Sequence, residues 1–136
     1  MVPAGAELWL DGGHNPDGGR AIASALADLE ERVSRPLVLV VGMLASKDSR
    51  GFLRNFAGLA RRIVTVPIPQ QDNAAPAAAL AETARAVGIP AEVSADLESA
   101  MAAIAEFSLD QRPRILVTGS LYLAGAVLAA NGTPPH

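Results

Sequence analysis

Hydrophobic positions along the chain follow two alternating patterns. Short runs of apolar residues, of which Leu37–Val41 (LVLVV) is the clearest, predict strands that are buried on both faces. Between these runs, apolar residues such as Ile22, Leu26 and Leu29 recur at steps of three and four positions, and this period predicts amphipathic helices. The strands are expected at residues 7–10, 37–41, 62–66, 91–93 and 114–118.

Capping residues and prolines mark where the helices begin and end. Asn15 is a good N-cap for a first helix that begins at Pro16, and Pro36 closes that segment. Gly88 is a natural stop for a later helix, and Asp96 is suited to cap the next one. The remaining helices are expected at residues 49–60, 76–87, 97–107 and 120–130, followed by a frayed tail at 131–136.

The order of these elements predicts the fold class. Strand and helix alternate along the whole chain, which indicates an α/β fold with a mostly parallel sheet and helices on both faces. The 136 residues suit a single domain, 1–136, with a core of its own. In such sheets, ligands bind outside the carboxyl ends of the strands, so the loops that follow the strands are the places to look for chemistry.

Composition narrows the classes of function. Aromatic residues make up only 4% of the chain, its net charge is −3, and it contains no cysteine. Few aromatics and no long basic run argue against a nucleic-acid partner, and the lack of cysteine excludes disulfide and thiolate chemistry. No apolar run approaches the roughly 20 residues that cross a bilayer, and the N-terminus does not resemble a signal peptide. We therefore expect a cytoplasmic protein with no membrane partner.

Several loops that follow predicted strands carry polar residues. They read DGGHNP, GMLASKDS, PIPQQDN and TGSLY in chain order. Because the carboxyl ends of parallel strands meet at one edge of a sheet, we expect polar residues far apart in sequence to gather at a single rim. The residues concerned are Asp11, His14, Asn15, Lys47, Asp48 and Ser120.

Familiar catalytic motifs do not fit these loops. The stretch GHNPDGGR is a near miss to a P-loop, because Gly19 and Arg20 stand where a lysine and a hydroxyl residue are required. No G-x-G-x-x-G fingerprint and no G-x-S-x-G nucleophile elbow occurs. The Asp11 and His14 pair alone supplies too few ligands for a metal site, so none is expected.

Residue type and spacing leave two interpretations for each candidate. Asp11 and His14 form either an acid/base pair, in which the carboxylate could accept hydrogen bonds from a ribose or an amine, or a turn brace beside a surface histidine. Lys47 is either a cation for a carboxylate or phosphate, or a solvated loop residue. Ser120 caps the last helix in either case, and the N–H groups at that helix start also suit an anion.

Three stretches together resemble the C-terminal domain of folylpolyglutamate synthase/dihydrofolate synthase, a branch of the Mur ligase family. They are LWLDGGHNPDGGRAIASAL, VVGMLASKD and VTGSLYLAGAVL, and the likeness runs in order through essentially the whole chain. The resemblance implies a Rossmann-like, mostly parallel sheet of about five to six strands. It also implies that ATP phosphorylates a folate carboxyl group and that the amine of glutamate attacks the acyl phosphate.

The resemblance assigns roles to individual residues. It implies that Asp11, His14 and Asn15 contact ATP, and that Lys47 and Ser120, with His14 at the boundary, contact the incoming glutamate. Folate enzymes commonly read G-M-L-x-D-K-D in the second loop, and Ser46 departs from that pattern here.

The family's P-loop, folate site and Mg²⁺ ligands have no counterpart in this sequence. The resemblance therefore implies that an N-terminal P-loop domain is the partner, and that this chain is an excised domain, a truncated product or one half of a split enzyme. Two alternatives stay open: the C-terminal domain of another Mur-family amino-acid ligase, and a stand-alone module that binds nucleotide weakly. We expect no catalysis by the isolated chain.

Overall fold

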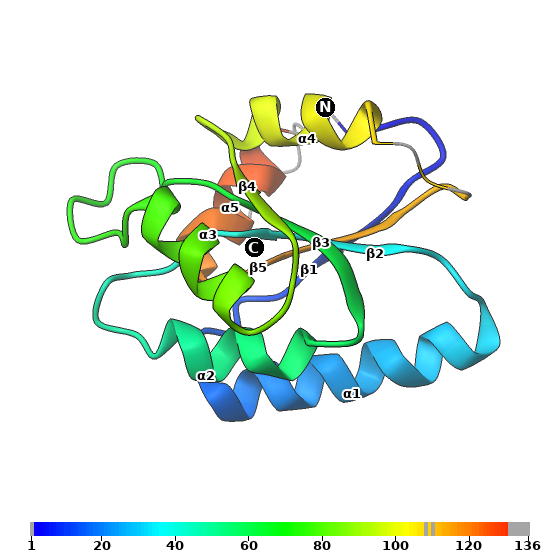
Figure 1. Ribbon diagram of the computed structural model, residues 1–136. Coiled ribbons are helices and arrows are strands. Elements are labelled where there is room, and N and C mark those ends of the chain that lie inside the picture. The colour runs from blue at the N-terminus through cyan, green and yellow to red at the C-terminus, as the bar shows by residue number, and fades with distance from the viewer. Residues whose placement is uncertain (1, 108, 110, 131–136) are drawn as a thin grey trace.

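The computed structural model describes residues 2–107, 109 and 111–130. Within these residues, five strands and their connecting helices alternate along the chain (Figure 1). The predicted tail at 131–136 lies outside the described residues. The strands are β1 (Glu7–Leu10), β2 (Leu37–Val41), β3 (Ala60–Thr65), β4 (Ala91–Val93) and β5 (Arg114–Thr118). The helices are α1 (Pro16–Arg32), α2 (Ser49–Leu53), the 3₁₀ turn η1 (Arg54–Phe56), α3 (Ala77–Ala86), α4 (Leu97–Ala105) and α5 (Leu121–Ala130).

The strands form one sheet in the order β1-β5-β2-β3-β4, and every neighbouring pair is parallel. β5, the last strand in the chain, is therefore inserted between β1 and β2. The register pairs Leu10 with Val117 on one side of β5 and Val41 with Thr118 on the other. This confirms the expected α/β fold with a parallel sheet.

Helices cover both faces of the sheet, as predicted. Alternate residues of a strand point to opposite faces, so Leu39 of β2 packs with α1, α2 and α3 while Val38 packs with α4 and α5. Figure 1 shows α1 and α2 below the sheet and α4 and α5 above it. Burial on both faces explains why β2 reads as a continuous apolar run.

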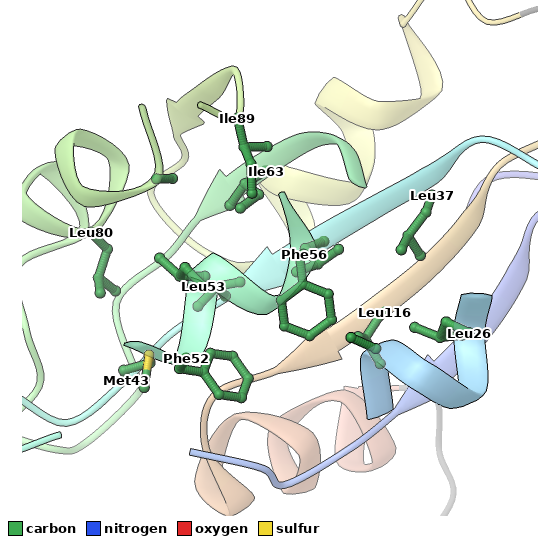
Figure 2. Packing of buried hydrophobic residues seen from close by; sticks show 14 residues of the cluster. Leu26, Leu37, Met43, Phe52, Leu53, Phe56, Ile63, Leu80, Ile89 and Leu116 are labelled. Carbon is green, nitrogen blue, oxygen red and sulfur yellow. The ribbon is translucent and has the colours of Figure 1, made fainter. Parts of the chain in front are cut away.

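The larger part of the core lies between the sheet and the first three helices. Phe52 and Phe56 stand at its centre, with ring centroids 5.5 Å apart, and both are fully buried. Figure 2 shows these rings between Leu53 and Ile63 on one side and Leu116 on the other. The short α2 and η1 are therefore held in place by their aromatic side chains and not by helix length.

The prediction of a helix at 49–60 is wrong in its second half. α2 ends at Leu53, η1 follows, and β3 already begins at Ala60. Gly58 has a φ of 79°, a left-handed conformation that ends helical structure and turns the chain toward the sheet. The apolar period continued because the buried residues of η1 point the same way as those of α2. α4 likewise ends at Ala105, two residues before the predicted end.

A buried arginine ties together the amino ends of two strands and the end of α1. Arg114 is 1% exposed, and its Nε donates to Oε1 of Glu7 over 2.8 Å. Its other nitrogens reach Oε2 of Glu30 at 3.4 Å and the carbonyl oxygen of Val33 at 3.1 Å. The Arg114 hydrogen bond is the main reason that the pKa of Glu7 lies below its ordinary value. This cluster lies at the amino end of β5, so it supports the fold and not the rim described below.

Candidate functional site

The sheet order creates a crevice at the carboxyl end of β5. The chain leaves β1 and β2 toward α1 and α2 on one face, whereas it leaves β5 toward α5 on the other face. Loops that depart in opposite directions from adjacent strands leave a gap between them, and ligands of open α/β sheets bind in such gaps. Because β5 has β1 and β2 as neighbours, the loops after these three strands meet at one place.

The loop after β1 is fixed by its own polar atoms. The carboxylate of Asp11 accepts a hydrogen bond from the backbone N–H of Gly13 at 2.9 Å. Nδ1 of His14 lies 3.1 Å from the carbonyl oxygen of Gly12. Because a carbonyl oxygen only accepts, Nδ1 is the donor in this contact. Asp11 therefore braces the turn, and the contact with Gly12 fixes the orientation of the His14 ring.

Asn15 acts as the N-cap of α1, as the sequence predicted. Its side-chain oxygen accepts the N–H of Gly18 at 2.8 Å, and Pro16 occupies the first position of the helix. The cap determines the direction in which α1 leaves the rim. Asn15 itself is exposed and does not line the pocket described below.

The loop after β2 is held by the segment that precedes α3. The backbone N–H of Ala45 donates to Asn73 at 2.9 Å, and that of Ala75 donates to Met43 at 2.8 Å. These bonds anchor the turn that carries Lys47, whose side chain is half-buried. Asp48 is occupied as the N-cap of α2, where it accepts the N–H of Gly51 at 2.9 Å.

The loop after β5 depends on a glycine. Gly119 has a φ of 99°, and a Cβ there would come within 2.6 Å of the carbonyl oxygen of Gly42. Its N–H donates to the carbonyl oxygen of Gly13 at 2.9 Å, which ties this loop directly to the one after β1. Ser120 follows as the predicted helix cap, and its Oγ accepts the N–H of Tyr122 at 3.0 Å.

A pocket of about 110 Å³ lies where the three loops meet. It brings together His14, Lys47 and Ser120, which the sequence predicted to share one rim. Asp11 braces the loop that carries His14 but does not line the pocket. The complete lining is His14, Leu44, Lys47, Gly119, Ser120, Leu121 and Tyr122.

Sequence reasoning missed two residues of this rim. Leu121 and Tyr122 begin α5 and are 72% and 56% exposed, among the most exposed large apolar side chains in the described residues. Their sequence signal was the pair of large apolar residues directly after a helix cap. They give the mouth of the pocket an apolar side.

The chemistry of the pocket suits an anionic group. Lys47 supplies a cation, His14 an imidazole edge and Ser120 a hydroxyl at a helix start. Over the part of the chain that the structure describes, no three His, Asp or Glu residues lie close enough to hold a metal ion. No helix in that part is long and apolar enough to cross a membrane.

A larger hollow of about 470 Å³ lies elsewhere, between the end of α4, the amino end of β5 and residues Pro3 and Ala4. Among the described residues that line it, Arg112 is the charged one, and it already donates to the carbonyl oxygen of Ala4. The larger hollow lacks the polar side chains that meet at the smaller pocket. We therefore place the candidate site at the smaller pocket, although its volume is lower.

Comparisons with known proteins agree on one family. A family model described as "Mur ligase, glutamate ligase domain" matches residues 2–121. A folylpolyglutamate synthase of Lacticaseibacillus casei is 32% identical over 122 residues. The match covers 88% of this chain and 26% of that protein.

Solved structures give the same result for the fold. The folylpolyglutamate synthase of Mycobacterium tuberculosis, solved with ADP and AMPPCP, matches with a TM-score of 0.79 and 27% identity, over 95% of this chain and 30% of that one. The bifunctional folylpolyglutamate synthase/dihydrofolate synthase of Yersinia pestis, solved with AMPPNP and Mn, matches with a TM-score of 0.76 and 28% identity, over 92% of this chain and 28% of that one. The chain thus spans less than a third of the length of these relatives.

Proposed function

We propose a function for this chain from the family to which it belongs: it is a member of the Mur ligase, glutamate ligase domain family. In our proposal it acts as the C-terminal domain of an ATP-dependent folate–glutamate ligase. The observation that carries the proposal is the meeting of His14, Lys47 and Ser120 at one pocket from three separate loops. Relatives named folylpolyglutamate synthase match most of the chain, which supports the same activity.

We propose that the loops contact different parts of the substrates. The likeness of the loop after β1 to that of folate–glutamate ligases supports a role for Asp11, His14 and Asn15 in contacting the nucleotide. Lys47 and Ser120 would bind a carboxylate of the incoming glutamate. The Lys47 ammonium group attracts an anion, and the Ser120 hydroxyl, which accepts the N–H of Tyr122, still has its own proton to donate to a carboxylate oxygen. His14 lies in the same pocket as these two residues, so it would stand at the boundary between nucleotide and amino acid.

ATP and Mg²⁺ would complete this chemistry in the larger enzyme. Mg²⁺ and a P-loop supply the electrostatic stabilisation on which phosphoryl transfer depends. The family resemblance implies that the Mg²⁺ ligands lie in the partner domain, and we adopt that location in our proposal. This chain would contribute binding and orientation of the nucleotide and glutamate, and would be inactive alone.

The exposed apolar side chains at the mouth of the pocket support the proposal that a partner domain closes over it. Leu121 and Tyr122 stand exposed beside His14 and Lys47, so a surface packed against them would also cover the pocket. Interfaces between domains combine such apolar contacts with polar ones. We therefore propose that an N-terminal P-loop domain, in the same polypeptide as in the longer relatives, docks at this rim.

A chimera tests the proposed function. This chain would replace the matching region of the Lacticaseibacillus casei relative, and ATP-dependent addition of glutamate to folate would be measured as ADP release. We expect an active chimera, no activity from the isolated chain, and about 10-fold or greater loss with Lys47→Ala, because a hydrogen bond to a charged group disappears. Arg61→Ala, an exposed cation at the start of β3, is the control. An active chimera that Lys47→Ala leaves unchanged would refute the glutamate-binding role.

A further inference from the structure

We propose that Asn55 is a positioning residue that sets the separation between His14 and Lys47. Its Nδ2 lies 3.0 Å from the carbonyl oxygen of Pro16, in the first turn of α1. The same nitrogen lies 3.2 Å and 3.1 Å from the carbonyl oxygens of Gly51 and Phe52 in α2. Asn55 therefore connects the helix that follows the His14 loop to the helix that follows the Lys47 loop.

The need for such a link comes from the strand order. His14 follows β1 and Lys47 follows β2, but these two strands do not pair, because β5 lies between them. Sheet hydrogen bonds therefore fix the distance between the two loops only through β5. The contact between α1 and α2 is a second, direct constraint, and it lies immediately behind the loops.

Two glycines allow the helices to approach this closely. A Cβ at Gly19 would lie 2.7 Å from Nδ2 of Asn55 and 2.9 Å from the Phe52 ring. A Cβ at Gly51 would lie 2.8 Å from the Pro16 ring. Side chains at either position would force α1 and α2 apart, so glycine on each helix and the amide of Asn55 act on the same contact.

A purely local role for Asn55 is the competing explanation. Its bonds to Gly51 and Phe52 span only four and three residues, as in a side chain that completes the end of α2. In that case replacing Asn55 would lower stability without moving His14 relative to Lys47. The bond to Pro16 spans 39 residues and makes the positioning role testable, because it predicts a change of distance at the pocket.

The chain contains no cysteine, so a cysteine pair can measure that distance directly. The double variant His14→Cys, Lys47→Cys would be cross-linked with thiol-specific reagents of short and long span, at a temperature at which every variant is folded by NMR. The ratio of short to long cross-links reports the separation. No nucleotide, folate or glutamate is added, so the result stands whether or not the proposed ligase function is correct; the pocket's importance rests on that function.

Asn55→Asp is the central variant, because it keeps the side-chain shape but replaces the donor with a carboxylate oxygen, which the carbonyl oxygen of Pro16 repels. We expect it to lower the ratio by about 3- to 10-fold, the effect of losing a hydrogen bond on the population of the close arrangement. Gly19→Ala keeps the Asn55 side chain but adds a methyl group 2.7 Å from its Nδ2 and 2.9 Å from the Phe52 ring. It should therefore push α1 away from α2 and lower the ratio too, and it is the test variant if Asn55→Asp does not fold. Ile104→Val, buried on the other face of the sheet, loosens the core as a control and should leave the ratio unchanged. A ratio unaffected by Asn55→Asp or, where that variant is unfolded, by Gly19→Ala overturns the proposal, as does an equal fall with Ile104→Val.

Discussion

Arg114 shows how one residue can determine stability at a distance from the site. It is almost fully buried, and it neutralises Glu7 and Glu30 while also donating to the carbonyl of Val33. Removing one partner of a buried ion pair leaves uncompensated charge, which costs about 3–5 kcal/mol in well-buried pairs. Because both carboxylates here are about one-third exposed, the cost should be smaller.

We therefore expect Arg114→Met to lower the free energy of unfolding by about 2 kcal/mol, as measured by urea denaturation. Arg54→Met, at an exposed arginine of η1, should change the unfolding free energy by less than about 0.5 kcal/mol. Equal stability of Arg114→Met and the unchanged chain would show that the ion pairs contribute nothing.

The same cluster predicts how stability depends on pH. Hydrogen bonds from Arg114 and Trp9 lower the pKa of Glu7, and hydrogen bonds from Ser34 and Arg35 lower that of Glu30. A carboxyl group with a lowered pKa in the folded state stabilises the fold above its unfolded pKa of about 4.5, and this contribution is lost as the pH falls below it.

Urea midpoints between about pH 6 and pH 3 should therefore fall in the unchanged chain, and Glu7→Gln should make the fall shallower because one lowered pKa is removed. Glu98→Gln, an exposed glutamate of α4, is the control. A pH profile that is identical with and without Glu7 would contradict the linkage.

Residue identities predicted part of the site and missed the rest for definite reasons. His14, Lys47 and Ser120 were predictable because each lies in the loop after a strand, and ligands of parallel sheets bind at these loops. Asn55 was not, since its bond to Pro16 crosses 39 residues and has no local pattern. The ligand contacts proposed for Asp11 and Asn15 stay predictions, because the structure shows these side chains bracing a turn and capping a helix.

At the scale of elements, the strands were easier to predict than the helices. β1, β2, β4 and β5 have the predicted bounds, because prolines or glycines near their ends leave little freedom in where they begin and end. β3 begins at Ala60, two residues before the predicted start, in the segment where the helix was overextended. The apolar period in residues 54–60 arises because Phe56 packs into the core, and not because the helix continues. The left-handed conformation of Gly58 marks where helical structure ends.

The loop after β5 gives a prediction at this scale. Gly119→Ala places a methyl group against the Gly42 carbonyl oxygen and forces an unfavourable φ, so we expect a loss of about 2 kcal/mol or more in unfolding free energy. Gly125→Ala, in the middle of α5 with open space around the added methyl group, is the matched control and should be neutral or stabilising. Gly119→Ala as stable as the unchanged chain would mean that the loop can adopt another conformation.

At the scale of the whole molecule, the sequence predicted the layers but not the strand order. Alternating elements indicate a parallel sheet with helices on both faces, whatever the order of its strands. Nothing in the local pattern placed β5 between β1 and β2, yet that insertion creates the crevice and brings the three loops together. The sequence could predict that the loops meet at one edge, because this holds for any parallel sheet. Which loops are neighbours there became known only from the strand order in the structure.

The central proposal is that the carboxyl-end rim binds the nucleotide and the amino acid that a folate–glutamate ligase would use. The most direct measurement is an NMR titration of the isotope-labelled chain with a non-hydrolysable ATP analogue and glutamate, with affinities of about 1 mM expected for half of a cleft. We predict that the shifted signals cluster at residues 11–15, 44–47 and 119–122, and that Asp11→Ala and Lys47→Ala weaken the response. Shifts centred on the hollow beside Arg112, or equal shifts in the two variants and the unchanged chain, would contradict the account.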